Sequence, residues 1–145
     1  MKLNFPEYRL QIKSEKSKNY VFDLVRKKYV VLTPEEWVRQ HLLHHLIDLG
    51  YPQSLISIER QLPSSKRRYD LVVYDRNGEL LLIAECKSAM VPINEQTIEQ
   101  INAYLMQLPA PYALLTNGLN HYFLGREIRG VLNYQQIPPF ATISG

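Results

Sequence analysis

One hairpin signal constrains the fold of this chain more than any other feature of its sequence. Asn77-Gly78 separates two mostly apolar runs, residues 68–76 and 79–87, within the stretch RRYDLVVYDRNGELLLIAECKSAM. An asparagine-glycine pair between such runs predicts a two-residue type I′ loop, because both loop positions need a positive φ. The two runs are therefore predicted to form neighbouring antiparallel strands whose register is set by the loop.

Charged residues stand at one end of these two apolar strands. In the predicted register Asp70 lies opposite Glu85, with the two Cβ atoms about 5 Å apart. Lys87 shares the face of Glu85, because it lies two residues further along the strand. Two carboxylates this close repel each other unless something compensates. Mg²⁺ is one such compensation, since it binds one or two carboxylates together with waters and phosphate oxygens. A partly buried ion network that includes Arg68 and performs no chemistry is the alternative.

The remaining elements predict one domain of the α/β (α+β) class. We expect helix, three strands, helix and two strands, forming a mixed central sheet flanked by helices. The predicted elements are helices at 33–50 and 93–108 and strands at 54–62, 68–76, 79–87, 112–118 and 121–128. The domain divides into an N-terminal β extension over 1–32, a core over 33–125 and a C-terminal tail over 126–145, which we expect to be irregular from residue 135 on.

The first helix carries a third acidic candidate. Thr33 suits the N-cap, and Gly50 suits the end of the helix. Glu35 is predicted to face the core, because it shares a helical face with Val38. Glu36 is assigned to the capping box and to the outer face, and it is the fallback for Glu35.

Composition excludes several classes of protein. The chain has 145 residues, a net charge of +3 and one cysteine, so an internal disulfide and a cysteine-rich zinc site are excluded. No apolar run approaches the roughly 20 residues that span a bilayer, and the first residues lack the apolar core of a signal peptide. We expect a cytoplasmic protein with no membrane association.

Basic residues gather in three places. The clusters at 13–18 and 26–28 are interpreted as ordinary solvated charges. The third cluster lies directly beside Asp70 and is predicted to contact nucleic-acid phosphates. It consists of Lys66, Arg67 and Arg68.

These motifs resemble those of a known superfamily. Asp70 followed by AECK (84–87) is similar to the D…(D/E)xK core of the PD-(D/E)XK nucleases, and QINAY (100–104) is similar to the QxxxY element of the RecB-type and type I restriction branches. With TPEEWVRQHLL and YALLTNG, the chain resembles the N-terminal nuclease domain of type I restriction enzyme R subunits over about residues 33–125.

This resemblance implies a fold, an activity and a set of site residues. The implied fold is the restriction-endonuclease-like αβββαβ core, and the implied activity is Mg²⁺- or Mn²⁺-dependent endonucleolytic cleavage of DNA. The implied metal ligands are Asp70, Glu85 and the carbonyl of Cys86, with Glu35 helping to hold metal or water. Lys87 would position or activate the attacking water. Gln100 and Tyr104 would support the site and contact the nucleic acid.

Two departures from the family pattern leave alternatives open. Tyr69 stands where the motif has its nominal proline, and no G-x-x-x-x-G-K-[ST] phosphate loop for an ATP-driven translocase is present. The alternatives are a free-standing nuclease domain and one that works with a separate restriction-modification or translocase subunit. A homodimer would suit double-strand cleavage. The competing function is a catalytically inactive nuclease-fold module that binds DNA or protein.

Overall fold

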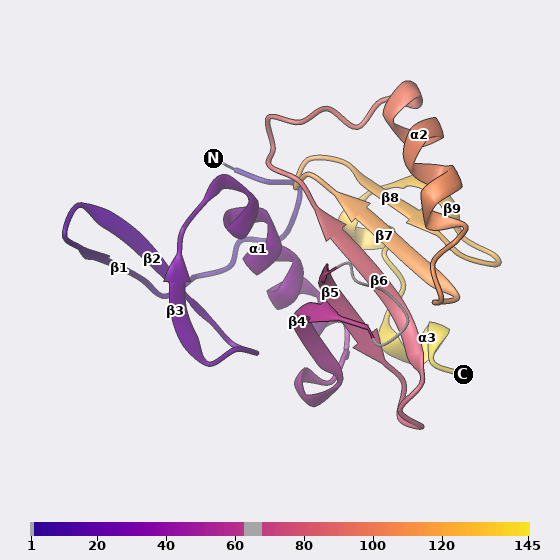
Figure 1. Ribbon diagram of the computed structural model, residues 1–145, viewed down its shortest axis with the longest axis horizontal. Coiled ribbons are helices and arrows are strands. Elements are labelled where there is room, and N and C mark those ends of the chain that lie inside the picture. The colour runs from indigo at the N-terminus through magenta and orange to yellow at the C-terminus, as the bar shows by residue number, and fades with distance from the viewer. Residues whose placement is uncertain (1, 63–67) are drawn as a thin grey trace.

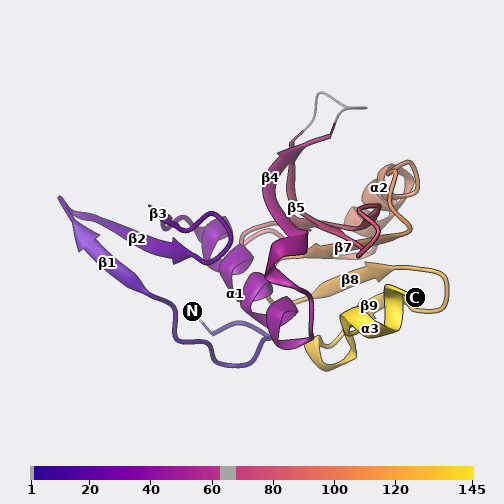
Figure 2. The same ribbon diagram turned by 90° about the horizontal axis from the view of Figure 1, so that it is seen from below.

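The chain folds into an α+β structure with two β-sheets and few helices (Figure 1). The computed structural model describes residues 2–62 and 68–145, without the side chains of residues 100, 101, 104 and 105. A three-stranded antiparallel sheet has the order β1-β2-β3, and a six-stranded mixed sheet has the order β4-β5-β6-β7-β8-β9. Helix α1 lies between the two sheets in both ribbon views (Figures 1 and 2).

The order of elements follows the prediction of helix, three strands, helix and two strands. The small sheet comes first, as β1 (Ile12–Glu15), β2 (Lys18–Asp23) and β3 (Lys28–Val31). The central elements are α1 (Pro34–Asp48), the 3₁₀ turn η1 (Gln53–Leu55), β4 (Ile56–Gln61), β5 (Arg68–Tyr74), β6 (Leu80–Cys86), α2 (Glu95–Leu105), β7 (Tyr112–Thr116) and β8 (His121–Leu124). The chain ends with β9 (Arg129–Leu132), η2 (Tyr134–Gln136) and α3 (Phe140–Ile143).

The loop of the central hairpin differs from the predicted type I′ turn. Only Gly78 has a positive φ there (81°), and Asn77 does not. The Gly78 amide donates to the Asp75 carbonyl at 3.0 Å, and the Asp75 amide donates to the Glu79 carbonyl at 2.8 Å, which makes a three-residue loop. The prediction was wrong because a type I turn followed by a left-handed glycine also suits an asparagine-glycine pair.

The predicted register nevertheless holds toward the charged end of the hairpin. A register shift between Val73 and Tyr74 leaves Leu81 as an extra residue in β6. This bulge compensates for the longer loop, so that Val72 pairs with Ile83 and Leu71 with Ala84, as predicted. The charged residues therefore come to neighbouring positions on β5 and β6.

Helix α1 begins at its predicted cap and packs its apolar stripe against the large sheet. The Thr33 hydroxyl accepts the Glu36 amide at 3.0 Å. Val38, Leu42 and Leu46 are fully buried in the main core together with Leu71, Leu82 and other sheet residues. This packing fixes α1 beside the strands that carry the charged residues.

The crossover after β6 returns the chain parallel to it. Helix α2 follows β6, and β7 then pairs with β6 in parallel, as the sequence predicted. Ala113 and Leu115 of β7 pack with Ile98 of α2, whereas the intervening Leu114 belongs to the core that contains α1. Because successive strand residues point to opposite faces, α1 and α2 cover opposite faces of the large sheet.

The C-terminal segment is more ordered than the sequence predicted. Strand β9 pairs with β8 and extends the large sheet. Ile137, Phe140 and Ile143 are buried in the main core, and α3 forms at the segment that contains two of them. The expectation of irregular structure from residue 135 on was wrong for α3, because Phe140 and Ile143 pack on the core, which local proline content does not reveal.

Candidate functional site

Asp70 and Glu85 lie at the same end of neighbouring strands. Leu71 pairs with Ala84, and one residue further on the Asp70 Oδ2 atom accepts the backbone amide of Cys86 at 2.7 Å. The Asp70 side chain is 25% exposed, whereas Glu85 is buried. One carboxylate at this strand end is therefore open to solvent and the other is enclosed.

Lys87 and Cys86 complete the motif at the end of β6. Lys87 is exposed, and its backbone amide donates to the Thr116 carbonyl of β7 at 2.8 Å. The Cys86 thiol is buried, and this burial raises its pKa well above the ordinary value. The negative charges of the neighbouring Asp70 and Glu85 carboxylates raise the pKa further. This thiol is therefore protonated and unreactive.

A buried arginine from α1 reaches the Asp70 carboxylate. Arg39 Nη2 lies 3.5 Å from Asp70 Oδ1, and Arg39 Nη1 lies 3.0 Å from Glu36 Oε1. Glu59 Oε1 lies 3.6 Å from the same Nη1 atom. The positive charge beside Asp70 is thus held in place by two further carboxylates.

Glu35 does not face the core, and the prediction that it does was wrong. Glu35 is exposed, whereas Glu36, the residue assigned to the outer face, is buried. Arg26 Nη2 donates to Glu36 Oε1 at 2.9 Å, and Gln40 Nε2 donates to Glu36 Oε2 at 3.0 Å. A carboxylate can be buried here because these donors and Arg39 replace water around it.

The small sheet supplies part of this polar network. Asp23 is fully buried and accepts Arg26 Nε at 2.8 Å and Gln40 Nε2 at 2.8 Å. Burial alone would raise the pKa of Asp23, but the hydrogen bonds from the Arg26 backbone, from Gln40 and from the Arg26 side chain outweigh it and hold the pKa below its ordinary value. Asp23 is therefore ionised and links the end of β2 to α1.

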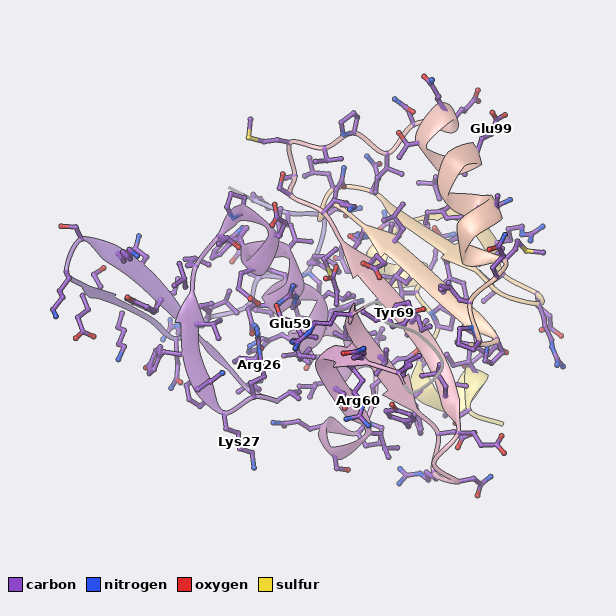
Figure 3. All side chains as sticks on the ribbon, viewed as in Figure 1. Arg26, Lys27, Glu59, Arg60, Tyr69 and Glu99 are labelled. Atoms are coloured by element: carbon purple, nitrogen blue, oxygen red, sulfur yellow. The ribbon has the colours of Figure 1, made fainter. Side chains whose placement is uncertain are left out.

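Glu59 occupies an unusual backbone position across from Asp70. Ile58 pairs with Leu71 and Arg60 pairs with Tyr69, so Glu59 is the β4 residue beside Asp70. Its φ of 53° lies in the left-handed region, which is uncommon for a residue other than glycine. Figure 3 shows Arg26 and Glu59 close together, and their charged groups lie 3.7 Å apart. Such backbone outliers tend to gather at functional sites.

Sequence reasoning missed these supporting residues, except that it named Glu36 as the fallback for Glu35. Glu36, Arg39 and Gln40 lie three and four positions apart, the spacing that places side chains on one helical face. That spacing was a usable signal, because a polar trio on the inner side of a helix needs partners. Their partners Arg26 and Glu59 come from distant segments, and nothing in the sequence links them to α1.

Several predicted site residues lie outside what the structure describes. Lys66 and Arg67 fall in the undescribed segment, and so do the side chains of Gln100 and Tyr104. Arg68 is described, is exposed and pairs with Gln61. A cavity of about 510 Å³ beside the site is lined by Arg68, by residues 56–61 of β4 and by Val25.

The described residues contain neither a cluster of three or more metal-ligating side chains nor a helix that could span a membrane. Among residues 2–62 and 68–145, with the stated side-chain gaps, no group of three or more His, Cys, Asp or Glu could hold a metal ion. In the same part of the chain, no helix has both the length and the apolar character to cross a membrane.

The charged strand end combines an aspartate on β5 with the sequence Glu-Cys-Lys at the end of β6, in an α+β domain. The family model described as "Type I restriction enzyme R protein N terminus (HSDR_N)" matches residues 34–138, and the chain belongs to this family. The resemblance to the N-terminal domain of type I restriction enzyme R subunits is therefore confirmed. Searches of curated proteins and of solved structures returned no significant match.

Proposed function

We propose that this chain carries a Mg²⁺-dependent DNA endonuclease site of the restriction-enzyme R-subunit type. The observation that carries the proposal is the strand-end geometry, in which Asp70 accepts the Cys86 amide at 2.7 Å beside Glu85, with Lys87 next in sequence. Family membership over residues 34–138 supports the same function. In this proposal, α1-β4-β5-β6-α2-β7 is the restriction-endonuclease-like αβββαβ core.

The residues at the strand end fit Mg²⁺ in their ligand chemistry. Mg²⁺ needs only one or two protein carboxylates and keeps several waters, so a site without three acidic side chains is compatible with it. The ligands would be Asp70, Glu85 and the Cys86 carbonyl, and the exposed part of Asp70 leaves an approach for waters and phosphate. When bound, Mg²⁺ or Mn²⁺ would polarise the scissile phosphate and lower the pKa of the attacking water.

The chain's own side chains then have separate roles. Lys87 is exposed beside Glu85, where its ammonium group would hold the attacking water and offset charge that develops on the phosphate. Arg39 is a positioning residue, because it contacts Asp70 and is itself held by Glu36. Glu36 therefore replaces Glu35 as the acidic residue of α1 that supports the site. Roles for Gln100 and Tyr104 at this site remain part of the proposal.

A nuclease assay with a matched lysine control tests this function. The full chain is incubated with plasmid and with single-stranded DNA in Mg²⁺ or Mn²⁺, alongside Lys87→Ala and the exposed-lysine control Lys2→Ala. Loss of a positioned proton-transfer group costs about 10²-fold or more in rate, so Lys87→Ala should lose at least that much and Lys2→Ala should lose none. Cleavage that survives Lys87→Ala would show that the site is wrongly assigned.

Calorimetry tests the metal separately from turnover. Mn²⁺ is titrated into the wild-type chain and into Glu85→Ala, with Glu79→Ala, an exposed acidic residue in the hairpin loop, as the control. Binding should be lost in Glu85→Ala and kept in Glu79→Ala. Equal Mn²⁺ affinity in all three proteins would remove Glu85 from the metal site.

One observation favours the second candidate, a catalytically inactive nuclease-fold module. Arg39 already lies 3.5 Å from Asp70, so a fixed cation occupies part of the space beside the carboxylate. DNA binding that weakens steeply with salt, without hydrolysis under any metal, would select this module. For either candidate, we propose DNA as the partner, within the restriction-system context that the family indicates.

A further inference from the structure

The small sheet has two chemically different faces. Paired residues of antiparallel strands share a face, and successive residues alternate between faces. Val21 and Asp23 of β2 are fully buried, so their face is turned toward the body of the protein. Tyr20 and Phe22 of the same strand therefore lie on the opposite, outer face, and both are only partly buried.

The outer face carries aromatic side chains that are open to solvent. Phe22 pairs with Tyr29, and their ring centroids lie 5.3 Å apart in an edge-to-face arrangement. Tyr20 pairs with Lys13 on one side and with Val31 on the other. Tyr29 is 39% exposed and Val31 is 47% exposed. We call the surface formed by Lys13, Tyr20, Phe22, Tyr29 and Val31 the arm face.

The surroundings of the arm face are basic. Lys13 Nζ lies 4.3 Å from the centroid of the Tyr29 ring, which places a cation directly over the aromatic surface. Between residues 12 and 31 the acidic residues are Glu15 and Asp23, of which Asp23 is buried and Glu15 lies 3.8 Å from Lys13. Exposed Lys18 lies on the same face of β2 as Tyr20, and the exposed lysines at positions 16 and 27 lie in the turns that join the strands, whereas Lys28 pairs with Asp23 on the inner face.

We propose that the arm face binds single-stranded nucleic acid. Proteins that bind single strands combine aromatic side chains, on which successive bases stack, with cations that hold the phosphates. Tyr20, Phe22 and Tyr29 supply the stacking surface, and the surrounding lysines supply the charge. A duplex keeps its bases stacked on one another, so the rings favour an unpaired strand. The inference deepens the proposed function and rests on it for the identity of the polymer as DNA.

The charge of the arm face favours nucleic acid over a second copy of the chain. A second copy of the chain would cover the same aromatic surface, but it would bring two sets of exposed lysines together, and like charges oppose that contact. The family match begins at residue 34, so the arm lies outside the matched region and adds a surface to it. Figures 1 and 2 show the small sheet projecting from the body, with α1 between it and the large sheet.

Binding assays without metal test the arm face independently of hydrolysis. Fluorescence anisotropy is measured with the full chain, EDTA and a labelled oligothymidylate or a duplex of equal length. Wild type should bind the single strand more tightly than the duplex. Tyr29→Ala should weaken single-strand binding about tenfold, the scale of one lost base-stacking contact. Ile12→Ala is the matched control, because Ile12 is exposed on the same sheet but pairs with Val21 on the inner face.

A second variant keeps the test decisive if Tyr29→Ala disturbs the sheet. Lys13→Gln combined with Lys18→Gln changes only exposed charges, and it should weaken binding and flatten its salt dependence. Thermal melts check the fold of each variant. Unchanged binding in both variants, tighter binding of the duplex, or a wild-type dimer in light scattering that Tyr29→Ala dissociates would each overturn the inference.

Lys87→Ala separates this inference from the proposed function. It should lower the hydrolysis rate at least about 10²-fold, and the protein should still bind the single strand more tightly than the duplex, because the arm face is intact. If the chain binds single strands through the arm face but never cleaves DNA, only the nuclease proposal fails. If the chain cleaves DNA in a Lys87-dependent way while the arm variants bind like wild type, only the arm inference fails.

Discussion

The guanidinium of Arg26 lies 2.9 Å from the Glu36 carboxylate, and this contact joins the small sheet to helix α1. Arg26 also lies 2.8 Å from the buried Asp23 carboxylate. Burial by itself would lower the pKa of Arg26, but the hydrogen bonds to the Glu36 and Asp23 carboxylates and their negative charges outweigh it and raise the pKa, so Arg26 is charged at every physiological pH. Because Glu36 also binds Arg39, the residues before the family match stabilise the positioning of the candidate site.

Removing Arg26 should destabilise the fold. Arg26→Ala leaves Asp23 and Glu36 without their shared cation, and loss of one partner from a buried ion pair costs about 3–5 kcal/mol. Since the Arg26 side chain is 17% exposed, we expect the lower end, about 3 kcal/mol. Urea denaturation measures the free energy of unfolding. Lys28→Ala, an exposed substitution at the start of β3, should change it by less than about 0.5 kcal/mol. Equal effects from the two substitutions would mean that the network contributes nothing.

The sequence predicted the parts of the fold that depend on local pattern. The Asn77-Gly78 turn signal placed Val72 across from Ile83, and the true loop differed without moving that pairing, because the bulge at Leu81 absorbed the extra residue. Burial of polar residues could not be predicted in the same way. Glu36 faces inward because the Arg26 guanidinium donates a hydrogen bond to its carboxylate there. A helical spacing rule that counts only apolar residues cannot detect this partner ten positions away.

The two adjacent glutamates of α1 offer a direct test of the finding that Glu36, and not Glu35, faces the interior. Glu36→Gln removes the charge that holds Arg26 and Arg39, and we expect it to lower the free energy of unfolding by about 2 kcal/mol. Glu35→Gln changes an exposed side chain and should change it by less than about 0.5 kcal/mol. Urea denaturation measures stability, and the nuclease assay should show a loss of rate for Glu36→Gln alone. The reverse order of effects would restore Glu35 as the inward residue.

Replacing either of two glycines with similar φ values by alanine should lower the free energy of unfolding, but by different amounts. Gly118 and Gly78 have φ values of 88° and 81°, so alanine at either position costs about 1–2 kcal/mol of backbone energy. A Cβ atom at Gly118 would lie 2.8 Å from Leu3 Cδ2 and 3.1 Å from Val38 Cγ2, whereas at Gly78 no atom of the described chain lies within 4 Å. Gly118→Ala should therefore cost about 1–3 kcal/mol more than Gly78→Ala.

Chemical denaturation of the two variants isolates the packing of the N-terminal segment. Leu3 is buried against this turn, and the Asn4 amide donates to the Gly118 carbonyl at 2.7 Å. The double variant Leu3→Ala/Gly118→Ala should lose less stability than the sum of the losses in the two single variants. Leu3→Ala removes the side-chain atoms that the new methyl group at position 118 would contact. If Gly118→Ala and Gly78→Ala cost the same, Leu3 does not pack on the turn as described.

Buried histidines predict that stability falls in mild acid. His121 Nε2 donates to the Asn4 carbonyl at 2.8 Å, and its Nδ1 accepts the Thr116 hydroxyl at 2.8 Å, which suits the neutral ring. His45 is held in the same way, by the Tyr134 carbonyl at 3.0 Å and the Tyr8 hydroxyl at 3.0 Å. Burial lowers the pKa of both rings; backbone hydrogen bonds oppose this shift, and for His45 so does the nearby Asp48.

The sign of the pH effect follows from these lowered pKa values. Below about pH 6.5 these histidines take up protons in the unfolded chain but stay neutral in the folded chain. Their contribution to the free energy of unfolding is therefore fully present above about pH 6.5 and is lost as the pH falls below it. Each such histidine contributes a slope of about 1.4 kcal/mol per pH unit. Urea denaturation at pH 7.5, 6.5 and 5.5 should show this fall in wild type, and a shallower fall in His121→Gln. The comparison uses the slope of the free energy of unfolding against pH, so a general loss of stability in His121→Gln does not affect it. Identical slopes in wild type and His121→Gln would contradict a neutral, buried His121.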